Sequence, residues 1–280
     1  MSLVFAAAMG HAPGITAWAD AAPAPQKEAL YTGFDELARE LRAARPDALI
    51  VLTSEHWANF FLDHASAFCV GRGAHFDGPV EPWLKVERAR IPGAPALAAA
   101  LIDDIIAADM DPSFSDEMML DHGTMVPLHF VTPAMDVPIV PVMINTLMAP
   151  QPSARRCLTL GRAVGRLAAR SAQRIGVLAT GGMSHDPGEV RHGWIDSDFD
   201  RRFLAEMAAG DLDALAGYST DALMAAGAGA MELLAWIALA GAVAQVTGAA
   251  RGRVVAYEPV QPWATGIGAM ILATEQAGVA

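Results

Sequence analysis

Short apolar runs alternate along the chain with longer segments whose apolar residues recur at helical spacing. Residues 27–45 place Leu30, Phe34, Leu37 and Leu41 on one face, which predicts an amphipathic helix. Continuous apolar runs between such segments are typical of strands that are buried on both faces. The pattern predicts strands at 3–8, 48–53, 137–144, 174–179, 253–256 and 267–273, and helices at 27–45, 95–108, 153–171, 199–209 and 229–246.

This alternation of strands and helices predicts an α/β fold in which helices cover both faces of a central sheet. A chain of 280 residues, 53% of them hydrophobic, is long enough to form one large core. The sequence shows no internal repeat and no low-complexity linker, so we expect a single domain over residues 1–280. Because residues 137–144 contain prolines, we expect that strand to be short or near a sheet edge.

The composition and charge indicate which binding partners and which cellular compartment to expect. A formal net charge of −12 argues against a nucleic-acid partner. Cys69 and Cys157 are far apart and form no paired motif, which fits free thiols in a reducing compartment. No Lys or Arg precedes Lys27, so the positive region of a signal peptide is missing, and Glu232 interrupts the longest apolar stretch. We therefore expect a cytoplasmic protein without a membrane partner.

Three histidines occupy the same topological place, a few residues after the end of a predicted strand. They are His11, His56 and His185. In open α/β sheets, ligands bind beyond the carboxyl ends of the strands. A loop or capping histidine explains any one of them, but three together favour a shared site. His122 is a fourth candidate at a turn, and the adjacent Asp121 could orient an imidazole.

Glu232 lies in an apolar helical segment with no Lys or Arg within a helical turn or two. A buried ionised carboxylate is costly unless it is paired or binds a metal. One interpretation places Glu232 near the start of the helix, facing water and stabilised by the helix dipole. The other makes it a metal ligand, with the histidines completing the site.

Two imidazoles and one carboxylate form the facial triad of non-haem iron(II) oxygenases. A further histidine, which titrates near neutrality, would suit the role of a base. The same donors can hold zinc and activate a water molecule, so a metal hydrolase is an alternative. A non-catalytic subunit that pairs with an active homologue is another, although such a subunit has no need of these residues.

Four motifs carry a resemblance to a known family: "SEH" (54–56), "DHG" followed by "VPL" (121–128), "TGGMSH" (180–185) and "MELLAWIALAGA" (231–242). Together they resemble the class III extradiol ring-cleavage dioxygenases, the superfamily of the protocatechuate 4,5-dioxygenase beta subunit and of 2,3-dihydroxyphenylpropionate 1,2-dioxygenase. The motifs stand in family order from Met9 to Met270, so the resemblance covers nearly the whole chain. It implies a mixed α/β sheet and an iron(II) enzyme that opens a catechol ring beside its hydroxyl groups with dioxygen, giving an open-chain semialdehyde acid.

The resemblance also assigns roles to residues. It implies iron ligands at His11, His56 and Glu232, an acid–base histidine at His185, and His122 over the substrate and dioxygen. Thr265 and Asp121 are the expected substrate contacts. The family's second ligand often follows an Asp, and here Glu55 takes that place.

The resemblance further predicts a dimer, and some relatives need a small partner subunit that caps the site. Residues 78–92 are similar to the gallate and 3-O-methylgallate branch, so a carboxylated, protocatechuate- or gallate-like catechol is the expected substrate.

Overall fold

The computed structural model describes residues 3–274. Its strands are β1 (Leu3–Met9), β2 (Ala48–Thr53), β3 (Phe68–Gly71), β4 (His75–Gly78), β5 (Ala89–Pro92), β6 (Ser113–Ser115), β7 (Ile139–Ile144), β8 (Ile175–Thr180), β9 (Gly252–Val260) and β10 (Thr265–Leu272). Its α-helices are α1 (Gly14–Ala17), α2 (Ala24–Ala44), α3 (Pro95–Ile106), α4 (His122–Val131), α5 (Ala154–Arg170), α6 (Ser197–Ala209), α7 (Leu212–Gly217), α8 (Thr220–Ala225) and α9 (Leu233–Thr247). Three 3₁₀ turns complete the described part: η1 (Ala19–Ala21), η2 (Ala228–Glu232) and η3 (Gln261–Trp263).

One eight-stranded mixed sheet organises the molecule, in the order β6-β3-β7-β2-β8-β1-β10-β9. The four central strands β7, β2, β8 and β1 run parallel, whereas β3 joins β7, and β10 joins β1 and β9, in antiparallel pairs. The predicted mixed α/β fold is confirmed. Because β2, β8 and β1 are neighbours and parallel, the loops after their carboxyl ends lie side by side.

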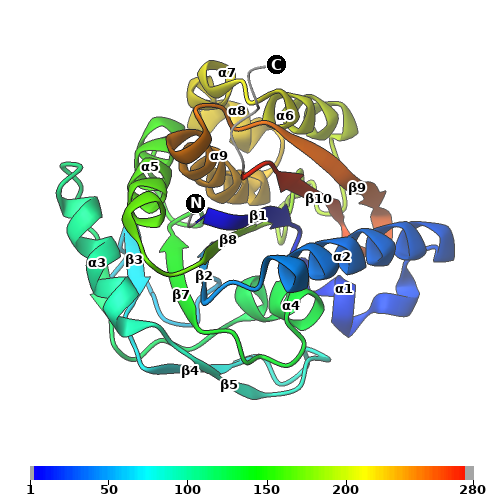
Figure 1. The fold of residues 1–280 in the computed structure, drawn as a ribbon. Helices are drawn as coiled ribbons and strands as arrows, with labels where there is room; N and C mark the ends of the chain where they lie inside the picture. The colour runs from blue at the N-terminus through cyan, green and yellow to red at the C-terminus, as the bar shows by residue number, and fades with distance from the viewer. Residues whose placement is uncertain (1–2, 275–280) are drawn as a thin grey trace.

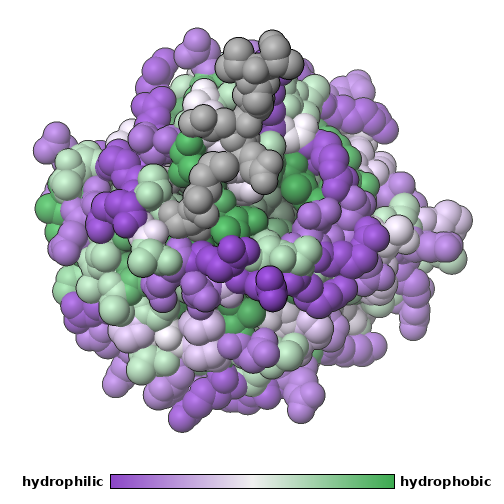
Figure 2. Space-filling view, viewed as in Figure 1, coloured by the Kyte–Doolittle hydropathy of each residue, from purple (hydrophilic) through white to green (hydrophobic). Residues whose placement is uncertain are grey.

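Helices cover both faces of this sheet, as predicted (Figure 1). On one face, α2 and α4 pack over the sheet, and the four α2 residues of the predicted apolar stripe are all buried there. On the other face, α3, α5, α6 and α9 enclose a second core against β1, β2 and β8. Hydrophilic residues dominate the outer surface in the view of Figure 2.

The strand that contains prolines was expected to be short or near a sheet edge, and the strand order shows where it lies. The proline-containing strand β7 is short but lies inside the sheet, between β3 and β2. Proline is tolerated there because the ladder with β3 begins at Val142, directly after Pro141. The short strands β3 to β6 and the helix α4 were not predicted, since each is too short or too interrupted to show a clear period. Pro127 lies inside α4.

The segment Ala228–Thr247 has the length and composition of a membrane span, but most of it is buried inside the protein. It forms η2 and the core helix α9. This agrees with the prediction of a buried helix, and it brings Glu232 to the amino-terminal end of α9.

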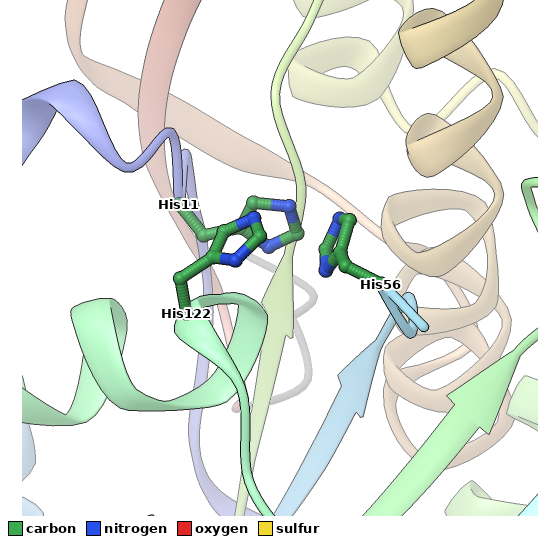
Figure 3. Close-up of side chains that lie close together, drawn as sticks. All are labelled: His11, His56 and His122. Carbon is green, nitrogen blue, oxygen red and sulfur yellow. The ribbon is translucent and has the colours of Figure 1, made fainter. Parts of the chain in front are cut away.

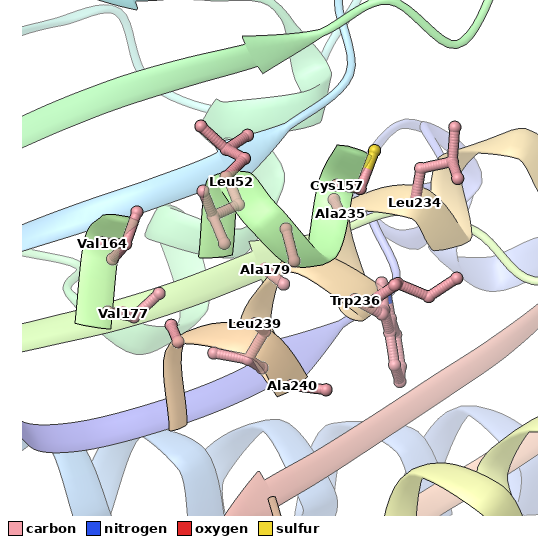
Figure 4. Packing of buried hydrophobic residues seen from close by; sticks show 14 of the residues in the cluster. Leu52, Cys157, Val164, Val177, Ala179, Leu234, Ala235, Trp236, Leu239 and Ala240 are labelled. Atoms are coloured by element: carbon pink, nitrogen blue, oxygen red, sulfur yellow. The ribbon is translucent and has the colours of Figure 1, made fainter. Parts of the chain in front are cut away.

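The helices α5 and α9 pack through small residues at very short distance. A Cβ atom added at Gly161 would overlap the carbonyl oxygen of Ala238, and one added at Gly241 would lie 2.5 Å from the carbonyl oxygen of Leu158. This approach lets Cys157 and Val164 of α5 and Leu239 of α9 fill the space beside Val177 and Ala179 of β8 (Figure 4). The packing fixes α9, and through it the position of Glu232.

We expect Gly161→Ala to lower the free energy of unfolding by about 2 kcal/mol or more, because the methyl group forces two helices apart. Gly217→Ala is the matched control, since nothing lies within 4 Å of a Cβ atom there. That change should stabilise the protein by up to about 1 kcal/mol. Urea unfolding followed by circular dichroism measures both. Equal stability of the two variants would contradict the close packing.

Candidate metal centre

Histidines from three separate segments meet at the carboxyl edge of the sheet (Figure 3). His11 follows the end of β1, His56 follows the end of β2, and His122 is the first residue of α4. One ring nitrogen of each lies within 4.8 Å of the others. The sequence predicted that His11 and His56 would share a site with His185, and the strand order brings all four histidines together.

A chain of hydroxyl groups fixes the ring protons of His11. The Thr53 hydroxyl donates to the carbonyl oxygen of Ser54 at 3.1 Å, and the Thr180 hydroxyl donates to Thr53 Oγ1 at 2.7 Å. Thr180 Oγ1, 3.0 Å from His11 Nδ1, is therefore left to accept the Nδ1 proton. The lone pair of His11 consequently lies on Nε2.

The carboxylate of Asp121 holds His56 in the same way. Asp121 Oδ2 lies 3.1 Å from His56 Nδ1 and accepts the His56 backbone N–H at 2.8 Å. A carboxylate only accepts, so Nδ1 carries a proton, and Nε2 is the ring nitrogen that faces Glu232. Asp121 Oδ1 also caps α4 by accepting from the Gly123 N–H at 2.9 Å. The sequence suggested Asp121 as an orienting group, and the ring that it orients is that of His56.

His122 and His185 have the same arrangement of protons. Glu81 Oε1 lies 2.6 Å from His122 Nδ1 and accepts the His122 backbone N–H at 3.0 Å. The carbonyl oxygen of Met183 lies 2.8 Å from His185 Nδ1. In both rings Nδ1 is the donor, and Nε2 is free to accept a proton or bind an electrophile.

Glu232 faces these rings from the other side. Its Oε2 lies 3.0 Å from His11 Nε2 and accepts the Gly182 N–H at 2.5 Å. Its Oε1 lies 3.1 Å from His56 Nε2 and 3.9 Å from His185 Nε2. Glu232 stands at the start of α9, as one interpretation proposed, but it is 4% exposed and faces the histidines instead of water.

The electrostatics of this cluster favour positive charge. Burial lowers the pKa of His56, but the carboxylates of Asp121 and Glu232 outweigh it and raise that pKa to about 10. Burial raises the pKa of Glu232, but His11 and His185 hold it well below its ordinary value. Glu232 is thus an ionised carboxylate in a buried place, and it needs a cationic partner.

Glycines permit the close approach of Glu232 and His185. Gly181, at φ +147°, lies so near that an added Cβ atom would be 2.8 Å from Glu232 Cβ. A Cβ atom at Gly229 would overlap the His185 ring, and one at Gly227, at φ +111°, would overlap the His185 carbonyl. The two glycine-containing stretches, one before His185 and one before Glu232, therefore pack against each other.

Two aspartates secure the loop that carries His185. Asp200 is fully buried and accepts hydrogen bonds from the Ser184 N–H, the Ser184 hydroxyl and the Tyr257 hydroxyl, each at 2.8 Å. Asp186 accepts from the Ala228 N–H at 2.8 Å, which ties the loop to η2. His185 therefore sits between two anchored neighbours.

The donor set fits a divalent cation. His11 Nε2 is buried and makes no hydrogen bond within residues 3–274, although Glu232 Oε2 is 3.0 Å away. Its lone pair and the carboxylate are thus two acceptors without a proton between them. Ligands on adjacent positions of an octahedral ion, each about 2.1 Å from the metal, lie about 3.0 Å apart. The distances from Glu232 to His11 and His56 match this spacing.

A cavity of about 630 Å³ opens over the cluster, and His11, His56, His122, His185 and Glu232 all line it. Thr265, an expected substrate contact, also lines it and donates its hydroxyl to the carbonyl oxygen of Trp263 at 2.9 Å. Asp121, the other expected contact, is fully buried behind His56 and is not among the lining residues. The structure therefore places Asp121 outside the cavity lining, against the His56 ring.

Comparison with known proteins identifies the family. The family described as "Catalytic LigB subunit of aromatic ring-opening dioxygenase" matches residues 5–268. The chain belongs to this family. It is an extradiol ring-cleaving dioxygenase by membership, which decides against the hydrolase alternative. The family is metal-dependent, in agreement with the donor set described above.

Individual relatives agree with this placement. A 2,3-dihydroxyphenylpropionate/2,3-dihydroxicinnamic acid 1,2-dioxygenase from Burkholderia vietnamiensis is 30% identical, over 89% of this chain and 91% of that protein. A protein of the same name from Paraburkholderia xenovorans is 31% identical, over 80% and 84%. An uncharacterized protein from Escherichia coli K12 has the same fold, with a TM-score of 0.62 at 18% identity over 87% of this chain and 92% of that one.

The sequence did not indicate the residues that hold the histidines in place through hydrogen bonds. Glu81, Thr180 and Asp200 contact His122, His11 and the loop of His185; Glu81 and Asp200 stand outside the quoted motifs, and Thr180 opens TGGMSH without any sign that its partner is His11. Glu81 is 41 residues from its histidine and Thr180 is 169 from its own. Only the strand order and the loop paths bring them together.

We expect Asp121→Asn to weaken metal binding about 10- to 100-fold, because the amide no longer holds the His56 ring as the carboxylate does. Asparagine still caps helices, so α4 should persist. Anaerobic titration with ferrous ion measures the affinity. Asp77→Asn, which breaks a surface pair with Arg90, is the matched control and should bind metal as the wild type does. Equal affinity of the two variants would contradict the orienting role.

Proposed function

We propose that this chain cleaves a catechol-type ring with dioxygen, using iron(II) held by His11, His56 and Glu232. The observation that carries the proposal is the approach of two histidine Nε2 atoms, those of His11 and His56, to the two oxygens of one buried carboxylate, at 3.0 and 3.1 Å, inside the cavity. Two neutral imidazoles and one carboxylate are the donor set of non-haem iron(II) oxygenases, and they leave open positions for substrate and dioxygen.

Iron in this site would bind both catechol oxygens and dioxygen and pass electron density from the ring to dioxygen. The carboxylate leaves the centre with net positive charge, which favours the catechol as its anion. Substrate and one dioxygen combine into one product, so the reaction needs no external reductant. The bond that breaks joins a hydroxyl-bearing carbon to a ring neighbour without a hydroxyl group.

His185 is the proton carrier of the proposed reaction. Its Nδ1 proton is committed to the Met183 carbonyl, so Nε2 is the atom that takes a hydroxyl proton from the arriving catechol. The same atom returns the proton as the ring opens. Anchoring of Ser184 by Asp200 and of Asp186 by Ala228 keeps that nitrogen 3.9 Å from Glu232 Oε1, at the edge of the ligand set.

His122 is proposed to contact the substrate hydroxyl and the reacting oxygen. Burial lowers the pKa of its ring, and the neighbouring His56, whose ring centroid is 4.0 Å away, lowers it further. A neutral His122 presents the Nε2 lone pair to the cavity and accepts a hydrogen bond from a hydroxyl group. Asp121 has a positioning role through His56, and Glu81 has one through His122.

Four further predictions stand on the sequence. A reducing, cytoplasmic location is consistent with Cys69 and Cys157, which are buried free thiols. The single catalytic domain of residues 1–280 rests on chain length and the lack of repeats or linkers, and the dimer and the small partner subunit over the cavity rest on the resemblance alone. Iron is preferred to zinc because ring cleavage requires a metal that relays electrons.

We expect the chain, loaded anaerobically with ferrous ion, to consume one dioxygen per catechol and give a yellow ring-opened product. The His185→Ala variant should lose about 10²- to 10⁴-fold in turnover while it retains its iron. An oxygen electrode and a colorimetric iron assay measure the two quantities. Uptake by the zinc-loaded chain, or loss of iron in His185→Ala, would contradict the proposal.

A further inference from the structure

We infer that the substrate's ring substituent is uncharged and aromatic, so that the substrate class is aryl-substituted catechols instead of carboxylated ones. The inference rests on the proposed function, since it takes the catechol to lie at the His/His/Glu cluster. It departs from the carboxylated catechol expected from the sequence.

The charge of the cavity is the first argument. Among the described residues that line it, none is Lys or Arg, and Glu189 is acidic; Glu232 is the proposed metal ligand. A carboxylate substituent that extends beyond the metal would find on the cavity wall no charge-assisted partner of the kind that such groups need. The names of the relatives from Burkholderia vietnamiensis and Paraburkholderia xenovorans contain a carboxylated compound, so that compound is the substrate against which the inference is tested.

Arg191 and Lys85 are close in sequence to residues that line the cavity, but their side chains lie outside it. Arg191 forms an ion pair with Asp186 at 2.9 Å and donates to the carbonyl oxygens of Met224 and Ala225. Lys85 is exposed outside the cavity, in the field of the Asp20 carboxylate. Neither is a lining residue. The described cavity therefore offers a carboxylate only histidine rings and neutral polar groups.

A row of aromatic rings is the second argument. It leads from the metal cluster to the cavity mouth: the His122 and Trp83 ring centroids are 6.4 Å apart, and Trp83 and Trp18 stack at 5.5 Å with 19° between their planes. We call these three residues the aromatic wall. Trp83 is 46% and Trp18 is 56% exposed, although both line the cavity. Large exposed aromatic faces beside a site mark a place for an apolar ligand.

A third tryptophan is held at the cavity in a strained conformation. Trp57 has φ +62°, which is rare for a bulky residue, and is 44% exposed. The buried carboxylate of Glu55 maintains this turn by accepting the backbone N–H groups of Trp57, Ala58 and Asn59. Strain maintained in this way is typical of functional positions. Glu55, which stands where the family often has aspartate, therefore has the physical role of holding the turn at Trp57.

The size of the cavity agrees with a two-ring substrate. Its volume of about 630 Å³ lies in the range of about 300–1,000 Å³ that encloses drug-sized ligands. A single-ring catechol would leave the aromatic wall uncovered. A second ring attached next to the hydroxyl groups would reach from the His/His/Glu cluster past His122 toward Trp83 and Trp18.

The test compares three substrates on the iron-loaded chain: 2,3-dihydroxybiphenyl, 3-(2,3-dihydroxyphenyl)propionate and unsubstituted catechol. We expect kcat/KM for the biphenyl to exceed that for the propionate by about tenfold or more. A higher value for the propionate would overturn the inference and leave the proposed function intact. Absence of oxygen uptake with all three, with iron bound, would instead contradict the proposed function.

Two variants and a control test the inference through changes in substrate preference instead of through the overall rate of the enzyme. Trp18→Ala should lower the ratio of kcat/KM for the biphenyl over that for catechol by about three- to tenfold. Gln151→Lys, which places a cation on the cavity wall, should raise kcat/KM for the propionate by about tenfold. Trp194→Ala is the matched control, because Trp194 packs on Arg191 and does not line the cavity. If Trp18→Ala and Trp194→Ala had the same ratio, the aromatic wall would have no role in recognition.

Discussion

One hydrogen bond from Nδ1 fixes each of the four imidazoles at the carboxyl edge of the sheet. The acceptors are Thr180, Asp121, Glu81 and the carbonyl of Met183. With those protons committed outward, the four Nε2 atoms face a cavity whose floor carries the ionised Glu232. A buried carboxylate is unfavourable without a cationic partner; the protonated His56 ring supplies one in the metal-free chain, and a bound cation would take its place.

The fold supplies this arrangement through strand order. β2, β8 and β1 are parallel neighbours, so the residues that follow them meet although they are far apart in sequence. Glu232 arrives from the opposite direction, at the start of α9, and the glycines at 161 and 241 set the depth of that helix. The backbone freedom at Gly181 and Gly227 then allows the two loops to touch. Core packing and site geometry are thus parts of one structure.

The sequence predicted the central sheet, the long helices and the histidines, because burial and strand position leave a periodic signal. It predicted β7 to be short or near an edge, since proline counts against an interior strand, and only the register with β3 shows why Pro141 is tolerated inside the sheet. The partner Glu81 left no signal, because polar residues outside motifs are common, and Thr180 stands in a motif that does not reveal its contact with His11. Asp121 was assigned to the substrate, since no pattern reveals that it turns toward His56. The charge of the cavity wall likewise appears only when distant loops are assembled.

The most direct test of the ligand set is an anomalous diffraction map from crystals of the chain loaded with ferrous ion without oxygen. The account predicts one iron peak about 2.0–2.2 Å from His11 Nε2, His56 Nε2 and a Glu232 oxygen, with His122 and His185 unbound. A peak held by His11, His56 and His122, with Glu232 turned away, would contradict it.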